Sequence, residues 1–396
     1  MSTATKKTGT LQQVLQQHAH TAQTDYNARV LAKLQVCRTS ALGYHLYKCK
    51  DDGCDTYKYQ YHSCRNRHCP QCGALQRIQW VEDRQRELLP VPYYHIVFTL
   101  PHELNSIIMG NRKNCYNLLF KAASSTLLQF GKDQKYLGAQ LGILAVLHTW
   151  GQQLSFHPHL HCIVSDGGVA TKKNMEKDKC IYWKNTRRDS GNFLFPVKAM
   201  SVVYRAIFLK GLKKAIAKKE INLNEAQQKE VKQLLENLYY KPWVVYAKKP
   251  FGGPQQVVQY LAAYTHKVAI SNNRILSIEN GNVSFKWKDY RHENAPKQMS
   301  LTASEFLRRF EQHILPKGFT KIRSYGYLAN RGRETNLAAI TKELKLPAHP
   351  PKVKQPWQIL LQEAFNIVHN QCPCCKKNTL VLIKQVYGNI EHIDSS

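Results

Sequence analysis

Residues 141–166 read LGILAVLHTWGQQLSFHPHLHCIVSD, and this stretch decides the predicted fold. Two apolar segments, 141–150 and 158–165, have the composition of β-strands. The polar residues 151–155 between them predict a turn. The stretch therefore predicts an antiparallel β-hairpin at the centre of the chain, and the other motifs are placed relative to it.

Three histidines lie in this hairpin. His159 and His161 are separated by one residue, so their side chains leave the strand on the same face. A turn at Gln153–Leu154 places His148 opposite His159. Three convergent imidazoles form a divalent-metal site that keeps coordination positions open for substrate. The alternative is three separate core histidines, but buried imidazoles without partners cost stability.

The charge of the chain predicts a polyanionic partner. The 396 residues include 57 Lys and Arg but only 27 Asp and Glu, a net charge of +30 that is spread along the sequence. Such an excess favours nucleic-acid binding. A ribosomal-type structural protein would have a similar charge, yet it would not need the histidine cluster. We expect no membrane partner, because the N-terminus is polar and no apolar run approaches the length of a membrane span.

Six of the twelve cysteines lie within residues 37–72, and this density predicts structural zinc. The pair Cys69 and Cys72 has the spacing of a zinc knuckle. Cys49 and Cys54, on a short hairpin, are expected to complete a four-thiolate site with it. Four further ligands in the segment form a possible second site: Cys37, His45, Cys64 and His68. A C-terminal cluster has too few evident ligands nearby and stays unassigned: Cys372, Cys374 and Cys375.

A helix after residues 252–254 (Gly-Gly-Pro) carries the second chemical element. Tyr260 and Tyr264 are one turn apart, so both project from one helix face beside an apolar stripe. Lys267 stays near that face and is expected to steady a phosphate. Tyrosines at this spacing are commonly packing residues, but beside a metal hairpin they are candidate nucleophiles.

Residues 318–333, GFTKIRSYGYLANRGR, interleave basic and aromatic residues. This composition suits contacts with phosphates and unstacked bases. An ordinary solvated loop is the alternative. The residues expected to contact DNA are Arg323, Tyr325, Tyr327, Arg331 and Arg333.

His159-Leu160-His161 resembles the histidine–hydrophobe–histidine motif of the HUH endonucleases, and His148 matches the third metal histidine of that superfamily. Over roughly residues 37–273 the chain resembles, more narrowly, the HUH transposases of the insertion-sequence-91 type. Four phrases carry this resemblance: SCRNRHCPQC, LLPVPYYHIVFTLPHELN, FHPHLHCIVSDGG and YLAAYTHKVAISN. It implies an α+β fold in which an HUH endonuclease core, an antiparallel sheet flanked by helices, follows an N-terminal zinc-binding domain. We expect domains at residues 1–90, 91–275 and 276–396, the last a basic DNA-binding region.

The same resemblance implies cleavage and rejoining of single-stranded DNA at insertion-element ends through a 5′-phosphotyrosine, in a rolling-circle type of transposition. It implies Mg²⁺ or Mn²⁺ at the histidines, one or two Zn²⁺ ions in the N-terminal domain, and no nucleotide cofactor. The partners would be the element's own DNA ends and target DNA, in the cytoplasm of a bacterium at its nucleoid. A plasmid relaxase or rolling-circle replication initiator would share the nuclease core but usually lacks the cysteine-rich segment, and a non-catalytic zinc protein would need no tyrosine.

Overall fold

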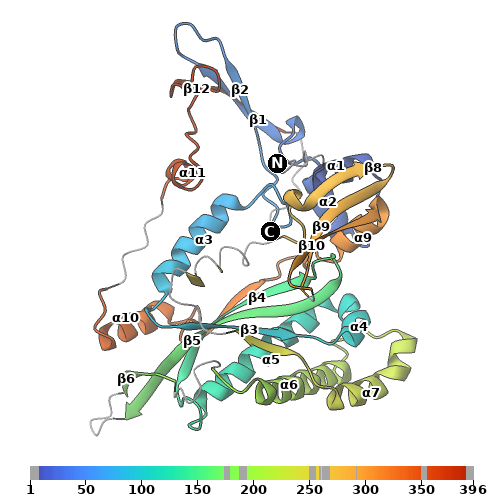
Figure 1. Ribbon diagram of the computed structural model, residues 1–396, viewed down its shortest axis with the longest axis vertical. Coiled ribbons are helices and arrows are strands. Elements are labelled where there is room, and N and C mark those ends of the chain that lie inside the picture. Colours follow the sequence, from blue (N-terminus) through green and yellow to red (C-terminus); the bar gives the residue numbers. More distant parts are fainter. Residues whose placement is uncertain are drawn as a thin grey trace.

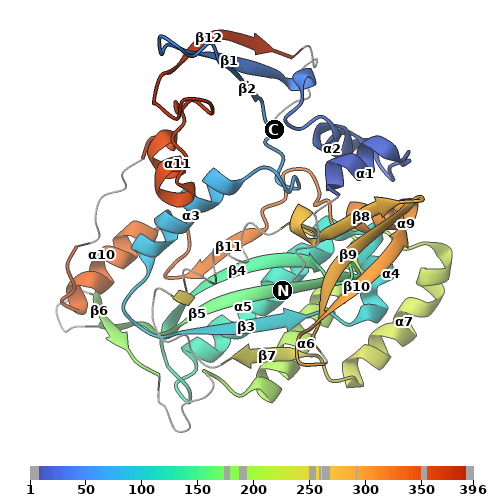
Figure 2. The same ribbon diagram turned by 45° about the horizontal axis from the view of Figure 1, so that its top comes forward.

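The protein forms three antiparallel sheets with helices packed around them (Figures 1 and 2). A six-stranded sheet occupies the lower half of Figure 1, and two three-stranded sheets lie above it. Among the described residues, no helix has the length and hydropathy of a membrane span. The computed structural model describes residues 9–173, 179–186, 194–248, 256–257, 260, 268–290, 292–348 and 355–388.

The predicted hairpin lies at the centre of the six-stranded sheet, whose order is β11-β4-β5-β3-β7 with β6 paired to the outer part of β5. The hairpin turn closes where the Gly151 N–H donates to the Ser155 carbonyl, at 2.9 Å, and Leu154 takes a left-handed φ of 57°. The strands are β3 (Tyr93–Thr99), β4 (Gln140–Trp150), β5 (Phe156–Lys173), β6 (Lys179–Lys184), β7 (Val245–Lys248) and β11 (Ile322–Gly326).

Helices cover the lower face of this sheet in Figure 1. The facing residues Leu147 and Leu160 are both fully buried in the main core, with Phe120 and Phe208 of the two long helices. Because side chains alternate along a strand, the histidines next to Leu147 and Leu160 point to the other face. The covering helices are α4 (Asn105–Gly110), α5 (Arg112–Lys132), α6 (Val197–Ala217) and α7 (Glu225–Tyr240).

The opposite face of the sheet carries a smaller core. Leu144 and Ile163 are buried there with Val257, and Trp80 of α3 (Ala74–Glu87) packs against them. Tyr260 packs against the same cluster. The histidine face is therefore partly covered by helical residues that are distant in the sequence: α3 precedes the hairpin, and Val257 and Tyr260 follow it.

The second sheet packs on the first two helices of the chain. The turn between its first two strands lies at Asn280 and Gly281, which have positive φ values of 48° and 74°, and a third strand follows this hairpin. Phe285 and Phe306 are buried in one core with Val14. These elements are α1 (Leu11–Gln17), α2 (Asp25–Gln35), β8 (Ile275–Glu279), β9 (Asn282–Asp289), β10 (Ala295–Thr302) and α9 (Ala303–Glu311).

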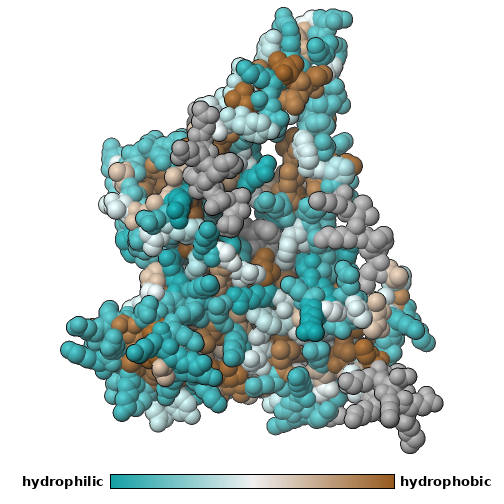
Figure 3. Space-filling view, turned by 180° about the vertical axis from the view of Figure 1, so that it is seen from behind, coloured by the Kyte–Doolittle hydropathy of each residue, from teal (hydrophilic) through white to brown (hydrophobic). Residues whose placement is uncertain are grey.

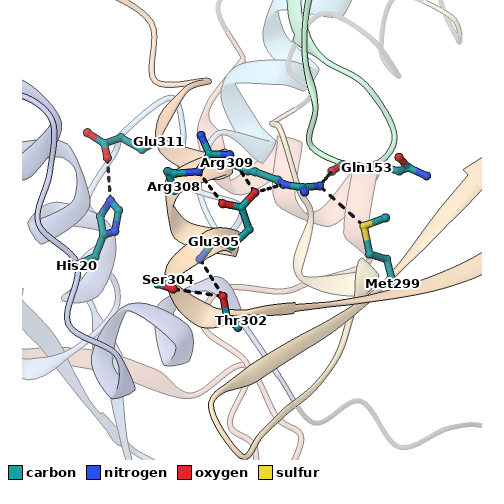
Figure 4. A network of polar contacts seen from close by, with 9 residues as sticks. All are labelled: His20, Gln153, Met299, Thr302, Ser304, Glu305, Arg308, Arg309 and Glu311. Atoms are coloured by element: carbon teal, nitrogen blue, oxygen red, sulfur yellow. Dashed lines mark hydrogen bonds and ion pairs between the residues drawn. The ribbon is translucent and has the colours of Figure 1, made fainter.

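A buried carboxylate connects α9 to the N-terminal helices. Glu311 of α9 is fully buried and lies 2.7 Å from Nε2 of His20 (Figure 4). It also accepts hydrogen bonds from the Gln23 N–H, at 2.6 Å, and the Asn27 amide, at 2.8 Å. A buried carboxylate is costly unless such partners satisfy it, so this contact fixes α9 against the N-terminal helices.

The third sheet joins the two ends of the described chain. Its order is β12-β1-β2, formed by β1 (Gly43–Cys49), β2 (Tyr57–Tyr61) and β12 (Leu380–Tyr387), and we call it the terminal sheet. It stands at the top of Figure 1, where the colours of the early and late sequence meet. The domain boundaries at residues 90 and 275 stay a prediction, but the first and third segments share the terminal sheet, and helices of the first segment pack on the second sheet. The remaining helices are α10 (Arg333–Glu343) and α11 (Trp357–Phe365), and α11 contacts α3.

Acid should destabilise this fold through His313. Its buried ring bonds the Leu154 carbonyl at 3.1 Å and the Thr149 hydroxyl at 3.2 Å, and burial lowers the pKa of His313 to about 4. An unfolded histidine binds a proton below about pH 6.5, whereas the folded one does not until about pH 4. The contribution of His313 to the free energy of unfolding is therefore fully present above pH 6.5 and is lost as the pH falls toward 4.

The free energy of unfolding should depend less on pH in the His313→Gln variant. One proton fewer is then taken up on unfolding, so the slope should fall by roughly 1.4 kcal/mol per pH unit. Urea unfolding of both proteins at several pH values between 4.5 and 7 measures it. His102→Gln, which changes an exposed imidazole, is the control. Equal slopes for the wild-type protein and His313→Gln would contradict the prediction.

Candidate functional site

The structure brings the three predicted histidines together. His148 lies directly opposite His159 in the β4–β5 pairing, which confirms the predicted register. Nε2 of His159 and Nε2 of His161 are 3.1 Å apart, and one ring nitrogen from each of the three lies within 4.8 Å of the others. His148 is almost completely buried, so the cluster is set into the sheet.

This donor set fits a divalent metal ion. Metal–imidazole bonds of about 2.1 Å place two nitrogens on one ion about 3 Å apart, as in the pair His159 and His161. Three neutral imidazoles from two adjacent strands hold the ligands rigidly and leave further coordination positions for oxygen atoms. The three side chains can therefore hold a metal ion that also binds a substrate.

A fourth histidine, His95 of β3, lies beside the cluster, and the sequence analysis missed it. Nε2 of His95 is 2.9 Å from Nδ1 of His161, and the two rings stack with their centroids 5.2 Å apart. Burial, with smaller contributions from Lys248 and His159, lowers the pKa of His95 to about 3. The imidazole is therefore neutral at pH 7 and has a lone pair with which it can accept a hydrogen bond.

Tyr260 completes the arrangement. Its hydroxyl oxygen lies 2.5 Å from Nε2 of His95 and 3.1 Å from Nδ1 of His161. One ring nitrogen of His161 thus faces the histidine cluster and the other faces the tyrosine. The other two predicted catalytic residues, Tyr264 and Lys267, lie outside the described residues.

The cysteines form two clusters, and their grouping differs from the predicted one. In the first cluster, Sγ of Cys37 lies 3.5 Å from Cys72 and 3.6 Å from Cys69. Cys64 lies 3.7 Å from Cys72. Four thiolates about 2.3 Å from one tetrahedral ion are separated by such distances, whereas a disulfide would need about 2.05 Å.

The predicted pairing of Cys49 and Cys54 with the knuckle at residues 69–72 is therefore corrected. These two cysteines lie with Cys372 and Cys375 instead, because β12 pairs with β1 and brings the end of the chain to them. The cluster near the C-terminus, unassigned in the sequence, thus belongs to the second group.

The predicted histidine ligands His45 and His68 belong to neither group. His68 is half-buried and accepts a hydrogen bond from the Leu315 N–H at 3.3 Å, and loss of hydration lowers its pKa to about 3. The His45 ring packs edge-on against His62. Both side chains make structural contacts. The presence of histidines in this cysteine-rich segment therefore did not identify zinc ligands.

The tyrosines of the predicted DNA-binding tract are packing residues. Tyr327 is only 1% exposed, which excludes base stacking, and burial raises its pKa to about 12. Tyr325 is half-buried against the main core, and burial raises its pKa as well. Residues 322–326 of the tract form β11, which pairs with β4, so the solvated loop considered as the alternative is corrected there to a strand of the sheet.

Two of the three arginines in this tract also have structural contacts. The Arg323 guanidinium lies over the Phe120 ring at 4.2 Å, and Arg333 pairs with Glu87 at 3.0 Å. Arg331 is exposed, and DNA binding by it stays a prediction. The basic and aromatic residues here belong to a strand that is half-buried along its whole length.

Comparison with known proteins supports a common origin over most of the chain. Residues 9–100 match the family described as "Transposase zinc-binding domain", and residues 142–335 match the one described as "Putative transposase". The "Putative transposase y4qJ" of Sinorhizobium fredii is 40% identical over 375 residues, covering 92% of this chain and 91% of that protein. The chain belongs to the insertion-sequence-91 transposase family.

A second relative in the family, the "Transposase for insertion sequence element IS801" of Pseudomonas savastanoi pv. phaseolicola, is 28% identical over 352 residues. The alignment covers 89% of this chain and 82% of the relative. No solved structure matches the chain significantly. The transposase is therefore an enzyme that acts on DNA, and its zinc-binding domain contains the first cysteine cluster.

Removing zinc from this transposase should unfold the first cysteine cluster. Cys37 and Cys69 are buried in the core that α1 and α2 form with the second sheet, so a zinc ion held by this cluster would support that core directly. Chelation at neutral pH is expected to cost several kcal/mol of stability and to weaken DNA binding, because zinc binding and folding are coupled in such segments. Thermal unfolding with and without chelator, followed by zinc re-addition, measures this. A fully reduced protein that contains no zinc but unfolds at the same temperature would contradict it.

Proposed function

We propose that this transposase cleaves and rejoins single-stranded DNA at the ends of its insertion element through a 5′-phosphotyrosine intermediate, in a rolling-circle type of transposition. The sheet with its histidine hairpin would then be an HUH endonuclease core. One observation carries the proposal: His161 faces the histidine cluster through one ring nitrogen and the Tyr260 hydroxyl through the other. This arrangement supports the proposal, because a candidate metal ligand would contact the proposed nucleophile directly.

In the proposed reaction the Tyr260 oxygen attacks the scissile phosphorus. A bond forms between the phenolic oxygen and phosphorus, the bond from phosphorus to the 3′ oxygen breaks, and a 3′-hydroxyl leaves. A divalent ion held by the three histidines would supply positive charge that offsets the charge developing on the phosphate. Since the phosphotyrosine conserves the energy of the cleaved bond, a 3′-hydroxyl can reverse the step without a nucleotide cofactor.

His95 would position the nucleophile. A free phenol has a pKa near 10, so its hydroxyl is a poor nucleophile at neutral pH unless it is oriented and its proton has an acceptor. Because His95 is neutral, its Nε2 can accept the Tyr260 proton in a hydrogen bond. His161 can donate from Nδ1 to the same oxygen when its Nε2 is a ligand. These two contacts would fix the direction of the oxygen lone pair.

Tyr264 would provide a second nucleophile. It follows Tyr260 by four residues, one helical turn if the predicted helix continues. Two tyrosines would allow one site to hold two 5′ ends during strand exchange. Lys267 would steady the phosphate from the same helix face. These two roles rest on the sequence alone.

The proposal is tested by incubating the purified protein with end-labelled single-stranded DNA from its element. The expected result is a covalent adduct that survives denaturation and maps to Tyr260 or Tyr264. Three nitrogen ligands favour Mn²⁺ over Mg²⁺, so Mn²⁺ should support cleavage at a lower concentration. A single strand from a plasmid origin is the parallel substrate: preferential cleavage of that strand would indicate a relaxase or replication initiator. No adduct with any of these strands would refute the proposal.

A further inference from the structure

We propose that Cys49, Cys54, Cys372 and Cys375 form a second four-thiolate zinc site, which fastens β12 to the hairpin of β1 and β2. The family match that describes a zinc-binding domain ends at residue 100, so it does not contain the two later cysteines. The inference is structural and does not depend on the proposed DNA chemistry.

The geometry is that of a tetrahedral thiolate site. Sγ of Cys49 lies 3.8 Å from Sγ of Cys375, and Sγ of Cys54 lies 3.7 Å from Sγ of Cys372. All four sulfurs are within 4.8 Å of one another. Zinc–sulfur bonds of about 2.3 Å predict a separation of roughly 3.8 Å between ligands, and the contacts are far too long for disulfides. The first cysteine cluster has the same spacing.

Each half of the site is a tight turn that points two thiols inward. The loop after β1 is closed by the Cys54 N–H, which donates to the Asp51 carbonyl at 2.9 Å. The C-terminal turn is closed by the Lys376 N–H, which donates to the Cys372 carbonyl at 3.1 Å. Cys374, which lies between these two ligands in the sequence, is exposed and does not belong to the cluster. The turn therefore directs Cys372 and Cys375 toward the site but not Cys374.

Hydroxyl groups surround the sulfurs. Oγ1 of Thr379 lies 3.0 Å from Sγ of Cys49, and Oγ1 of Thr56 lies 3.2 Å from Sγ of Cys54. Hydroxyls that donate to thiolates stabilise their negative charge and orient them toward a metal. Both ends of the chain therefore contribute a supporting residue as well as ligands.

The terminal sheet has almost no apolar core with which to hold β12. Only Leu380 and two of the cysteines, Cys49 and Cys372, are buried in its cluster. The molecule shows apolar side chains at its top, where this sheet lies (Figure 3). A sheet this small needs a metal or disulfide to be stable. Its exposed large side chains are Tyr57, Tyr59, Tyr61, Val381, Leu382, Ile383 and Tyr387.

The site would bridge segments more than 300 residues apart. β12 pairs with β1 from Leu380 to Tyr387, and Lys377 forms an ion pair with Asp51 at 2.7 Å. That pair is exposed and adds little stability, and an edge strand held only by backbone bonds would fray. The zinc ion would thus hold β12 and the turn before it to the hairpin of β1 and β2.

Metal content of the full-length protein tests the proposal. Cys375→Ser is expected to contain one zinc equivalent less than the matched control Cys374→Ser, which changes the neighbouring exposed thiol. The comparison is a difference, so metal at the histidine cluster does not affect it. Equal zinc in the two variants would overturn the proposal.

A double variant tests whether the two halves share one ion. Cys49→Ser combined with Cys375→Ser should lose the same single equivalent as either change alone, whereas Cys72→Ser combined with Cys375→Ser should lose two. Loss of two equivalents from the first combination would overturn the shared site. If these variants prove insoluble, cobalt titration of the metal-free wild-type protein decides: two tetrathiolate cobalt ions support the proposal, and one refutes it.

Discussion

Replacing Tyr260 by phenylalanine should lower the rate of covalent attachment to single-stranded DNA by at least about 10³-fold, which is a typical loss when a nucleophile is removed. The substitution keeps the ring that packs near Val257 and deletes only the hydroxyl that lies beside His95 and His161. The loss should therefore appear in the rate of chemistry, with little change in stability. Quantifying the denaturation-resistant adduct over time, with protein in excess over DNA, measures it.

Tyr246→Phe is the matched control, because Tyr246 is an exposed tyrosine on the edge strand of the same sheet. Tyr264→Phe and the double change Tyr260→Phe with Tyr264→Phe complete the series. If Tyr264 also acts, an adduct should persist in Tyr260→Phe at the rate of that second nucleophile and disappear in the double variant. An undiminished adduct in the double variant would place the nucleophile elsewhere.

Replacing His161 by alanine should remove metal-dependent cleavage, with a loss of at least about 10²-fold in rate. This side chain contributes a nitrogen to the histidine cluster and also contacts the Tyr260 oxygen. Its loss should therefore weaken metal binding and disturb the position of the tyrosine. His159→Ala should have a similar effect through the metal alone. Affinity for single-stranded DNA should change little, because contacts with the phosphate backbone dominate it.

His157→Ala is the matched control for these variants. It removes a neighbouring imidazole on the same strand but keeps the backbone carbonyl that bonds Nδ1 of His159 at 2.7 Å. Cleavage rates at increasing Mn²⁺ concentrations, with DNA binding measured in parallel, separate loss of metal from loss of substrate. Full activity of His161→Ala at any Mn²⁺ concentration would exclude the histidines as the metal site.

The histidine hairpin could be predicted from the sequence because its geometry is local. A short turn fixes the register of its two strands, and strand alternation then decides which side chains share a face. The pairing of His148 with His159 needs only these two rules. His95 lies on another strand, β3, and its place beside the hairpin could not be predicted from these local rules. Which strand of a sheet lies next to the hairpin is a property of the whole topology.

The zinc ligands show the same limit more clearly. The spacing of Cys69 and Cys72 indicated a knuckle, but spacing within a knuckle does not say which other pair completes it. Cys49 and Cys54 lie beside Cys372 and Cys375, more than 300 residues later in the sequence. The strand that brings these later cysteines close, β12, pairs with β1, and no local sequence pattern predicts that pairing. The nearer knuckle was the natural choice, and long-range pairing overrode it.

Tyr327 was misassigned for a different reason. Basic and aromatic residues that alternate can form a surface for nucleic acid, but strands at a sheet edge have the same pattern. Burial was decided by the packing of Tyr327 against Gly142, where a side chain of any size would meet the ring at 2.3 Å. A sequence shows the glycine but not what fills the space beside it.

The terminal sheet also sets an order of events during protein synthesis. Its first two strands leave the ribosome early, whereas the strand that pairs with β1 and two of the four thiols of its cluster come from residues 372–387. The nascent chain can fold its other parts from the N-terminus onward, but this sheet stays open until translation has passed Tyr387. A prematurely terminated chain would retain the histidine hairpin and Tyr260 and still lack the closed sheet.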